Sequence, residues 1–186
     1  MRSITALFVC LVFILTGCAD KNAPIDNALK LRNEMESSNG CAFHTTVTAD
    51  YGEKVYVFSM DCQTDKEGNL TFTVTMPDTI AGITGKISSA GGALTFDDQV
   101  LAFQTMADGL VTPVTAPWIL VKTLKSGYLK GCAETDAGFE ISADDSYADN
   151  ALHVQIVVKE NFPCSGEIFW NGRRVVTMTV EDFRYL

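Results

Sequence analysis

Residues 41–62 read CAFHTTVTADYGEKVYVFSMDC, and the fold can be inferred outward from this stretch. Apolar or small side chains alternate with polar ones on both sides of the turn sequence Asp-Tyr-Gly-Glu at 50–53. A period of two is typical of a strand with one buried face, and turn residues between two such runs predict a β-hairpin. Centring the hairpin on the middle of the turn places Cys41 opposite Cys62, with the two apolar faces on the same side.

The remainder of the chain carries the same pattern. The predicted strands cover residues 70–76, 84–90, 93–96, 100–103, 128–135, 138–142, 152–159, 164–170 and 173–180. Asn171-Gly172 separates the last two, and Asn-Gly between apolar runs favours a two-residue hairpin loop. Two segments depart from this period. In residues 25–37, which follow Pro24, the apolar residues Ile25, Ala28, Leu29 and Met35 fall near the helical spacing of 3.6, and Ser37-Ser38-Asn39-Gly40 is a plausible helix stop. Residues 117–125 begin with proline and are followed by Gly127, which are start and stop signals of a short helix. The sequence predicts an α+β fold: an antiparallel meander with one helix before it and one inside it.

The N-terminus has the three-part layout of an export signal. Arg2 precedes an apolar run at 4–15, and Leu15-Thr16-Gly17-Cys18 follows. The run is shorter than the roughly 20 residues that a helix needs to cross a bilayer, so we interpret it as a cleaved signal segment. The alternative is an ordinary signal peptide with a chance cysteine near its end.

Leu-Thr-Gly-Cys resembles the lipobox of bacterial lipoproteins. The resemblance implies cleavage of the signal peptide 1–17, a diacylglyceryl group on Cys18 with fatty chains such as palmitate, and a lipidated tether at 18–24. Residues 25–186 would then form a single extracytoplasmic domain, anchored by its lipid to a membrane of the cell envelope. Two acyl chains give a stable anchor, because each buried methylene contributes about 0.8 kcal/mol.

Charge and cysteine content narrow the function further. The formal net charge of −9 argues against nucleic acid and against electrostatic adhesion to anionic lipids. After loss of the signal and lipidation of Cys18, four cysteines of the exported chain remain, and two disulfides are expected. The hairpin register favours Cys41–Cys62 and leaves Cys132–Cys164 by elimination. No metal or other cofactor is expected, since no cysteine pair has C-x-x-C spacing.

The order of elements resembles the LolA/LolB-like lipoprotein carrier fold family and related germination lipoproteins of spore-forming bacteria. The stretches that carry the likeness run from Leu29 to Met76-Pro77, through 93–97 (ALTFD), and through 117–120 (PWIL). The resemblance implies a strongly curved antiparallel sheet, an unclosed barrel, with an N-terminal helix and a short inserted helix over its concave face. Carriers of this family shelter acyl chains there. The four mature cysteines are not part of the usual family pattern.

The resemblance implies a lining for a hydrophobic ligand. Its candidates are the large apolar residues Phe43, Phe58, Phe72, Phe96, Trp118, Leu120, Val121 and Leu124. An ordinary filled core would use the same residues. Two functions stay open: a membrane-anchored protein that binds a lipid, acyl chain or other hydrophobic ligand, or a non-enzymatic accessory lipoprotein that docks an envelope or spore-associated protein through its surface.

No catalytic constellation is recognisable in the sequence, and an enzyme is not expected. The strand parity places His44 and His153 on the wetter faces of their strands, where surface histidines are common. The acidic pairs at 97–98 and 144–145 are either paired carboxylates, cation ligands or solvated turns. No nucleophile elbow, zinc-protease motif or glycine-rich phosphate loop occurs in the chain.

Overall fold

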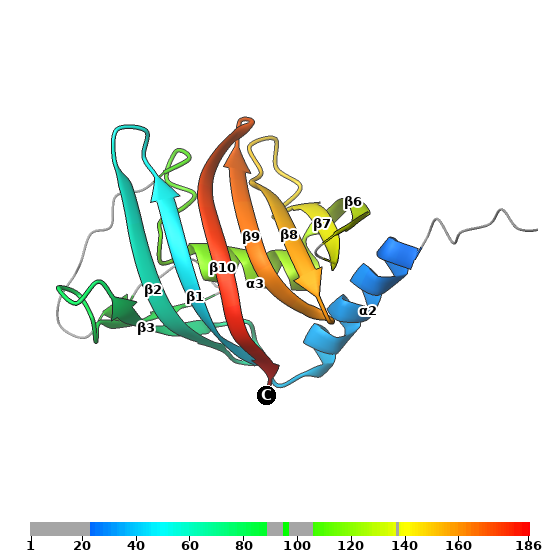
Figure 1. Ribbon diagram of the computed structural model, residues 1–186, viewed down its shortest axis with the longest axis horizontal. Coiled ribbons are helices and arrows are strands. Elements are labelled where there is room, and N and C mark those ends of the chain that lie inside the picture. The colour runs from blue at the N-terminus through cyan, green and yellow to red at the C-terminus, as the bar shows by residue number, and fades with distance from the viewer. Residues whose placement is uncertain (1–22, 89–94, 97–105, 137) are drawn as a thin grey trace, which may run out of the picture.

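The computed structural model describes residues 23–88, 95–96, 106–136 and 138–186. Two helices and ten strands make up this part of the chain (Figure 1). They are α2 (Ala23–Ser37), β1 (Cys41–Asp50), β2 (Val55–Thr64), β3 (Leu70–Met76), β4 (Thr84–Ile87), β5 (Thr95–Phe96), α3 (Ala116–Ser126), β6 (Tyr128–Thr135), β7 (Gly138–Asp144), β8 (His153–Lys159), β9 (Phe162–Trp170) and β10 (Arg173–Tyr185). The predicted signal peptide, the lipidation site Cys18 and the predicted strand at 100–103 lie outside the described residues.

All ten strands join in one antiparallel sheet, in the order β5-β4-β3-β2-β1-β10-β9-β8-β7-β6. The first and last strands pair in its centre, and a meander extends from each of them to an edge. Because β5 and β6 end at opposite edges, the chain between them has to cross one face of the sheet, and α3 lies on this crossing (Figure 1).

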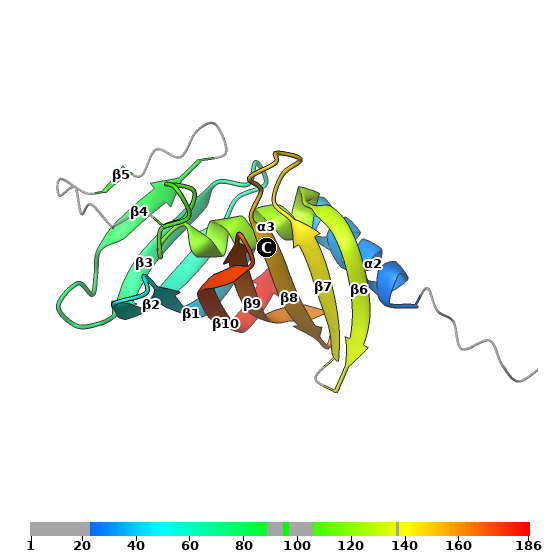
Figure 2. The same ribbon diagram turned by 90° about the horizontal axis from the view of Figure 1, so that it is seen from above.

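The sheet is strongly curved and remains open. Figure 2 shows it curling so that β4 and β6 stand on either side of α3. The alternation in the sequence matches the alternation in burial, as in β8, where Val154, Ile156 and Val158 are fully buried and their neighbours are not. These inward residues form one apolar core with both helices. The predicted fold class, a curved antiparallel sheet with an N-terminal and an inserted helix, is confirmed.

Most of helix α3 is buried, and Lys122, Lys125 and Ser126 lie on its accessible side. Pro117 lies in its first turn, and Ile119, Leu120 and Leu124 are almost completely inaccessible to solvent. A wide apolar stripe of this kind faces the core, and the polar residues lie on the opposite side of the helix. The helix approaches the sheet closely at Gly166 of β9, where a Cβ atom would lie only 2.4 Å from Cδ1 of Leu120. Glycine is therefore required for this contact.

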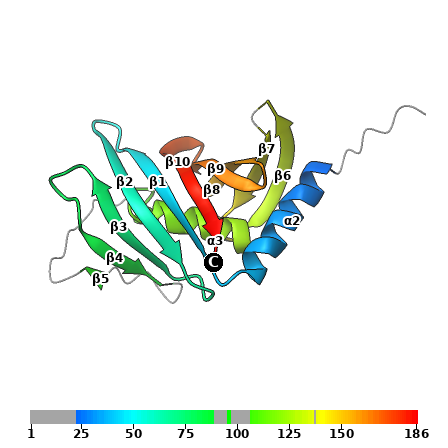
Figure 3. The same cartoon turned by 60° about the horizontal axis from the view of Figure 1, so that its bottom comes forward.

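Helix α2 packs beside the end of α3 and against β6 (Figure 3). Arg32 of α2 donates from Nε to the carbonyl of Leu124 at 2.9 Å and from Nη2 to that of Gly127 at 2.9 Å. The last carbonyls of a helix have no partner within the helix and carry partial negative charge, so a guanidinium stabilises this end. None of the described helices is long and apolar enough to cross a membrane.

The register of the first hairpin differs from the prediction by two residues. Phe43, not Cys41, lies opposite Cys62, and Asp50 pairs with Val55. The loop is longer than expected, because the carboxylate of Asp50 accepts the Gly52 N–H at 2.7 Å and holds Gly52 at a φ of 91°. A shift of two residues leaves every side chain on its predicted face, so the predicted apolar face of the hairpin is still correct.

This shift separates the cysteines that were expected to form a disulfide. Cys41 and Cys62 are diagonal neighbours, which lie about 7–8 Å apart between Cα atoms, beyond the usual reach of a disulfide. Cys132 and Cys164 lie on β6 and β9, with two strands between them. All four side chains are free thiols in the structure, so neither predicted disulfide is formed.

Two strands extend further than predicted because turn and bulge residues adopt positive φ. Glu160 and Asn161, at 52° and 71°, make a two-residue turn that lets β9 begin at Phe162. In β10 the register shifts beside Asp182, whose φ is 53°, and the strand continues to Tyr185. The predicted loop Asn171-Gly172 has the two positive φ values of a type I′ turn, 50° and 76°.

Candidate functional site

The structure brings most of the predicted lining residues together, but it packs them as a core. Phe43, Phe72, Leu120, Val121 and Leu124 belong to one buried cluster, and Phe58 is also buried. The Phe72 ring fills the space where Gly85 lacks a side chain. The side chain of Phe96 lies outside the described part of the structure. Only Trp118 among the described candidates is partly exposed. The interior at these residues is therefore filled with side chains.

A cleft of about 360 Å³ opens at the margin of this core, beside α3. Trp118 and Val121 supply its apolar wall. The other residues that line it come from α3, from the end of α2 and from the turn between β2 and β3: Glu36, Glu67, Gly68, Lys122, Lys125 and Ser126. Two residues that were predicted to line a ligand site therefore form the apolar wall of this cleft. Its rim carries both positively and negatively charged side chains.

Polar contacts hold the walls of this cleft in place. The indole Nε1 of Trp118 donates to the carbonyl of Gly68 at 3.0 Å. Lys122 lies 5.3 Å from the centre of the Trp118 ring and 3.3 Å from the carboxylate of Asp145. These contacts tie α3 to the β2–β3 turn on one side and to the β7–β8 loop on the other.

A second hollow, of about 740 Å³, lies on the opposite face of the sheet, away from the helices. One row of its lining residues runs straight across five strands: Arg184, Ala42, Gln63, Thr71 and Lys86. In the next row the predicted surface residue His44 contacts Asp61, with Nδ1 2.8 Å from Oδ1. The strained residue Asp182 also lines this outer groove. Charged and polar side chains therefore line this outer groove together with Ala42, Cys62 and two predicted ligand residues, Phe43 and Phe72.

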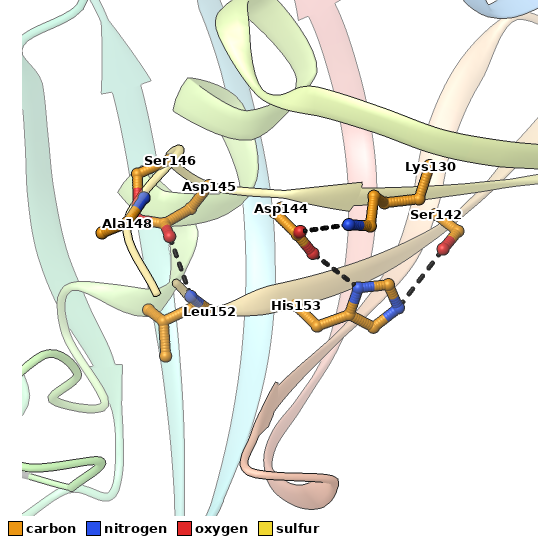
Figure 4. Close-up of polar contacts among 8 residues, drawn as sticks. All are labelled: Lys130, Ser142, Asp144, Asp145, Ser146, Ala148, Leu152 and His153. Atoms are coloured by element: carbon orange, nitrogen blue, oxygen red, sulfur yellow. Dashed lines mark hydrogen bonds and ion pairs between the residues drawn. The ribbon is translucent and has the colours of Figure 1, made fainter. Parts of the chain in front are cut away.

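A polar cluster that the sequence did not predict lies on β6, β7 and β8 (Figure 4). Asp144 and His153 pair directly across two strands, and Ser142 lies on the same face, one pleat away. His153 Nδ1 is 3.0 Å from Asp144 Oδ1, and its Nε2 is 3.2 Å from the hydroxyl of Ser142. Lys130 contacts the other carboxylate oxygen at 3.1 Å.

This cluster changes the interpretation of the acidic pair at 144–145. Partial burial raises the pKa of Asp144, but the contacts from His153 and Lys130 outweigh it and hold that pKa below its usual range. Asp145 accepts the Leu152 N–H at 2.9 Å and pairs with Lys122. Among the described residues no group of side chains has the make-up of a metal site. The pair at 97–98 lies outside these residues.

The sequence contained one signal for the cluster, but not its pairing. Ser142 and Asp144 are two apart on one strand and therefore share a face. The position of His153 opposite them depends on the loop at 145–152, whose length does not by itself determine the register.

Comparisons with known proteins give only distant likenesses. Neither a family model nor a curated protein matches the chain. Among solved structures, it is similar to an uncharacterized conserved protein from Thermus thermophilus, with a TM-score of 0.44, 13% identity and 87% of each chain covered. It is also similar to a LolA superfamily protein from Nitrosomonas europaea, with a TM-score of 0.44, 9% identity and coverage of 84% of this chain and 92% of that one. A DUF1329 family protein from Desulfovibrio piger has a TM-score of 0.40, 9% identity and coverage of 88% of this chain and 92% of that one.

Proposed function

We propose that this protein binds an amphiphile, such as a fatty acid or a lipid, with its apolar chain at the junction of α3 and the curved sheet. The observation that carries this proposal is the cleft of about 360 Å³ walled by Trp118 and Val121. Its volume lies within the usual range of ligand pockets, roughly 300–1,000 Å³.

The chemistry of the cleft favours an amphiphile over a purely apolar molecule. Trp118 and Val121 offer apolar contact, whereas Lys122, Lys125, Glu36 and Glu67 offer charge at the rim. Within the described part of the chain, Lys125 forms no ion pair and its Nζ donates to the carbonyl of Lys66 at 3.3 Å, so its ammonium is open to an anionic headgroup such as the carboxylate of a fatty acid. An apolar chain longer than the cleft would have to displace side chains of the filled core, starting at Val121.

A binding titration with a fluorescent long-chain fatty acid tests the proposal. We expect saturable binding by the wild type and at least a tenfold weaker affinity for Ser126→Trp, because Ser126 is exposed at the rim and an indole there would close the cleft without entering the core. Tyr147→Trp is the matched control, since Tyr147 is 85% exposed and does not line the cleft. Absence of binding by the wild type, or equal binding by Ser126→Trp, would contradict the proposal.

We also propose that the protein is attached to a membrane through Cys18. The support is the signal-like segment and the lipobox-like sequence that ends at Cys18. In the producing cell, the wild type should take up labelled palmitate and sediment with membranes, because two acyl chains anchor a protein stably. Cys18→Ser should lose both properties, whereas Cys10→Ser should keep them. Membrane attachment that survives Cys18→Ser would refute this assignment.

The outer groove favours a second candidate function, the docking of a polar protein partner. Arg184 and Lys86 stand at the two ends of one row of the groove, and among the described residues neither forms an ion pair. Unpaired cations at the ends of a groove suit a partner with separated acidic groups. Photo-crosslinking from position 71 in living cells should give one dominant adduct that Arg184→Glu abolishes. Lys30→Glu, on helix α2, is the control for the change in net charge.

A further inference from the structure

The contacts around His153 define where its protons lie. Asp144 is held ionised, and an ionised carboxylate only accepts hydrogen bonds, so Nδ1 of His153 carries the proton that it shares with Asp144. In neutral imidazole the other nitrogen is then an acceptor. The hydroxyl of Ser142 therefore donates to Nε2 across 3.2 Å. Ser142, His153 and Asp144 are thus arranged in the order in which a nucleophile, its base and the group that orients the base are arranged when a serine is activated (Figure 4).

The hydroxyl of Ser142 is accessible from one side. Its partner across β6 is Gly131, which has no side chain, and no atom lies within 4 Å of the place where a Cβ would stand. The side chain of His153 is 34% exposed. A small acyl group could therefore reach Ser142 over Gly131 without any movement of the sheet.

A bulge in β6 beside Ser142 positions Lys130. Leu129 pairs with Ala143 and Gly131 with Ser142, so Lys130 is the extra residue between them. The extra residue of a bulge is left outside the regular ladder. From this position the Nζ of Lys130 lies 3.1 Å from the carboxylate of Asp144.

We propose that Ser142 is a nucleophile that takes an acyl group from carboxylic esters, with His153 as its base. The Ser142 oxygen forms a bond to the acyl carbon while its proton passes to His153 Nε2. The ester C–O bond then breaks, and the leaving oxygen takes that proton. Water attacks the acyl-serine in the same way, releases the carboxylic acid and restores the hydroxyl. Asp144 is a positioning residue, which holds the imidazole through Nδ1, and Lys130 holds Asp144 in turn.

Covalent labelling of the intact protein tests this proposal. We expect a fluorophosphonate probe, or acetyl from p-nitrophenyl acetate, to be found on Ser142 by peptide mass spectrometry. Ser142→Ala should remove the adduct, and His153→Gln should slow its formation at least about 100-fold, the usual lower range for loss of a general base. Ser165→Ala is the matched control, because Ser165 is a partly buried serine of β9 that pairs with Val157 and that forms no hydrogen bond with a histidine of the described residues.

The labelling result distinguishes a nucleophilic Ser142 from a serine that only forms hydrogen bonds on the surface of the sheet. No adduct on Ser142, an adduct that forms equally fast in His153→Gln, or equal labelling of Ser165 would overturn the proposal. Unchanged thermal unfolding of Ser142→Ala would show that its fold is intact. This activity does not depend on the amphiphile cleft, so either proposal can fail without the other.

The pH profile of labelling tests the positioning role of Asp144. His153 contacts Asp144 and Ser142 of β7 and the ring of Phe169 in β9, and Lys130 of β6 contacts Asp144. In Asp144→Asn the maximal labelling rate should fall, and its rise with pH should move to lower pH, because a carboxylate favours the protonated imidazole. A purely structural role would leave the position of this rise unchanged, and that result would refute the assignment of Asp144.

Discussion

Among single residues, the residue type at two positions matters because of close packing at one and backbone conformation at the other. Gly166 allows Leu120 of α3 to approach the backbone of β9. Asp182 holds a φ of 53° beside the register shift of β10. Neither requirement is visible in the sequence, where one glycine or aspartate looks like another.

Gly166→Ala should lower the free energy of unfolding by about 1–3 kcal/mol, the usual cost of overpacking, because its Cβ would lie 2.4 Å from Leu120. Urea denaturation measures the change. The control is Gly131→Ala in β6, where no atom lies within 4 Å of the added Cβ and the effect should stay within about 0.5 kcal/mol. Equal effects at the two sites would contradict the close packing of Leu120 of α3 against Gly166 of β9.

Asp182→Val should cost about 1–2 kcal/mol in the same measurement, because a β-branched side chain does not tolerate the left-handed region. Asp182→Asn should be close to neutral, since asparagine adopts this conformation readily. A valine as well tolerated as asparagine would show that the backbone at this position relaxes.

Among the secondary-structure elements, α3 depends on helix α2 through one side chain. Arg32→Leu should lower stability by about 2–3 kcal/mol, because it removes charge-assisted hydrogen bonds to the carbonyls of Leu124 and Gly127. Lys30→Leu on the same helix is the control, since its exposed contact with Glu34 at 3.9 Å should contribute less than about 0.5 kcal/mol. Equal losses would mean that Arg32 does not hold the end of α3.

For the molecule as a whole, the buried thiols make stability sensitive to alkaline pH. Burial raises the pKa values of Cys41 and Cys62, and it raises that of Tyr185 to about 12. A group with a raised folded pKa gives its full stabilisation below its unfolded pKa, about 8.5 for a thiol, and loses it as the pH rises further. Stability under reducing conditions should therefore fall progressively as the pH rises above about 8.5.

Cys62→Ala tests this origin of the alkaline loss. Each buried thiol contributes a slope of up to about 1.4 kcal/mol per pH unit, so the variant should unfold with a shallower pH dependence than the wild type. Cys164→Ala is the control, because Cys164 is only partly buried. An unchanged slope in Cys62→Ala would assign the alkaline sensitivity to Cys41 or to Tyr185.

Local sequence patterns were sufficient to predict the elements and their faces. The periods of two and of 3.6, together with Pro117 and Asn171-Gly172, specify local structure, because burial of one face and backbone torsions act within a few residues. This is why both helices, most strands and the inward placement of Phe43 and Phe72 were predicted correctly.

Which residues meet across the sheet depends instead on contacts between distant segments. The register of the first hairpin depends on a loop whose conformation is set by the contact of Asp50 with Gly52, and a shift of two residues costs nothing in burial. The contact of Ser142 with His153 could not be predicted for the same reason, because it depends on how β7 and β8 pair across a loop. Whether the core is hollow or filled likewise depends on how side chains from distant strands fit together, which no local pattern specifies.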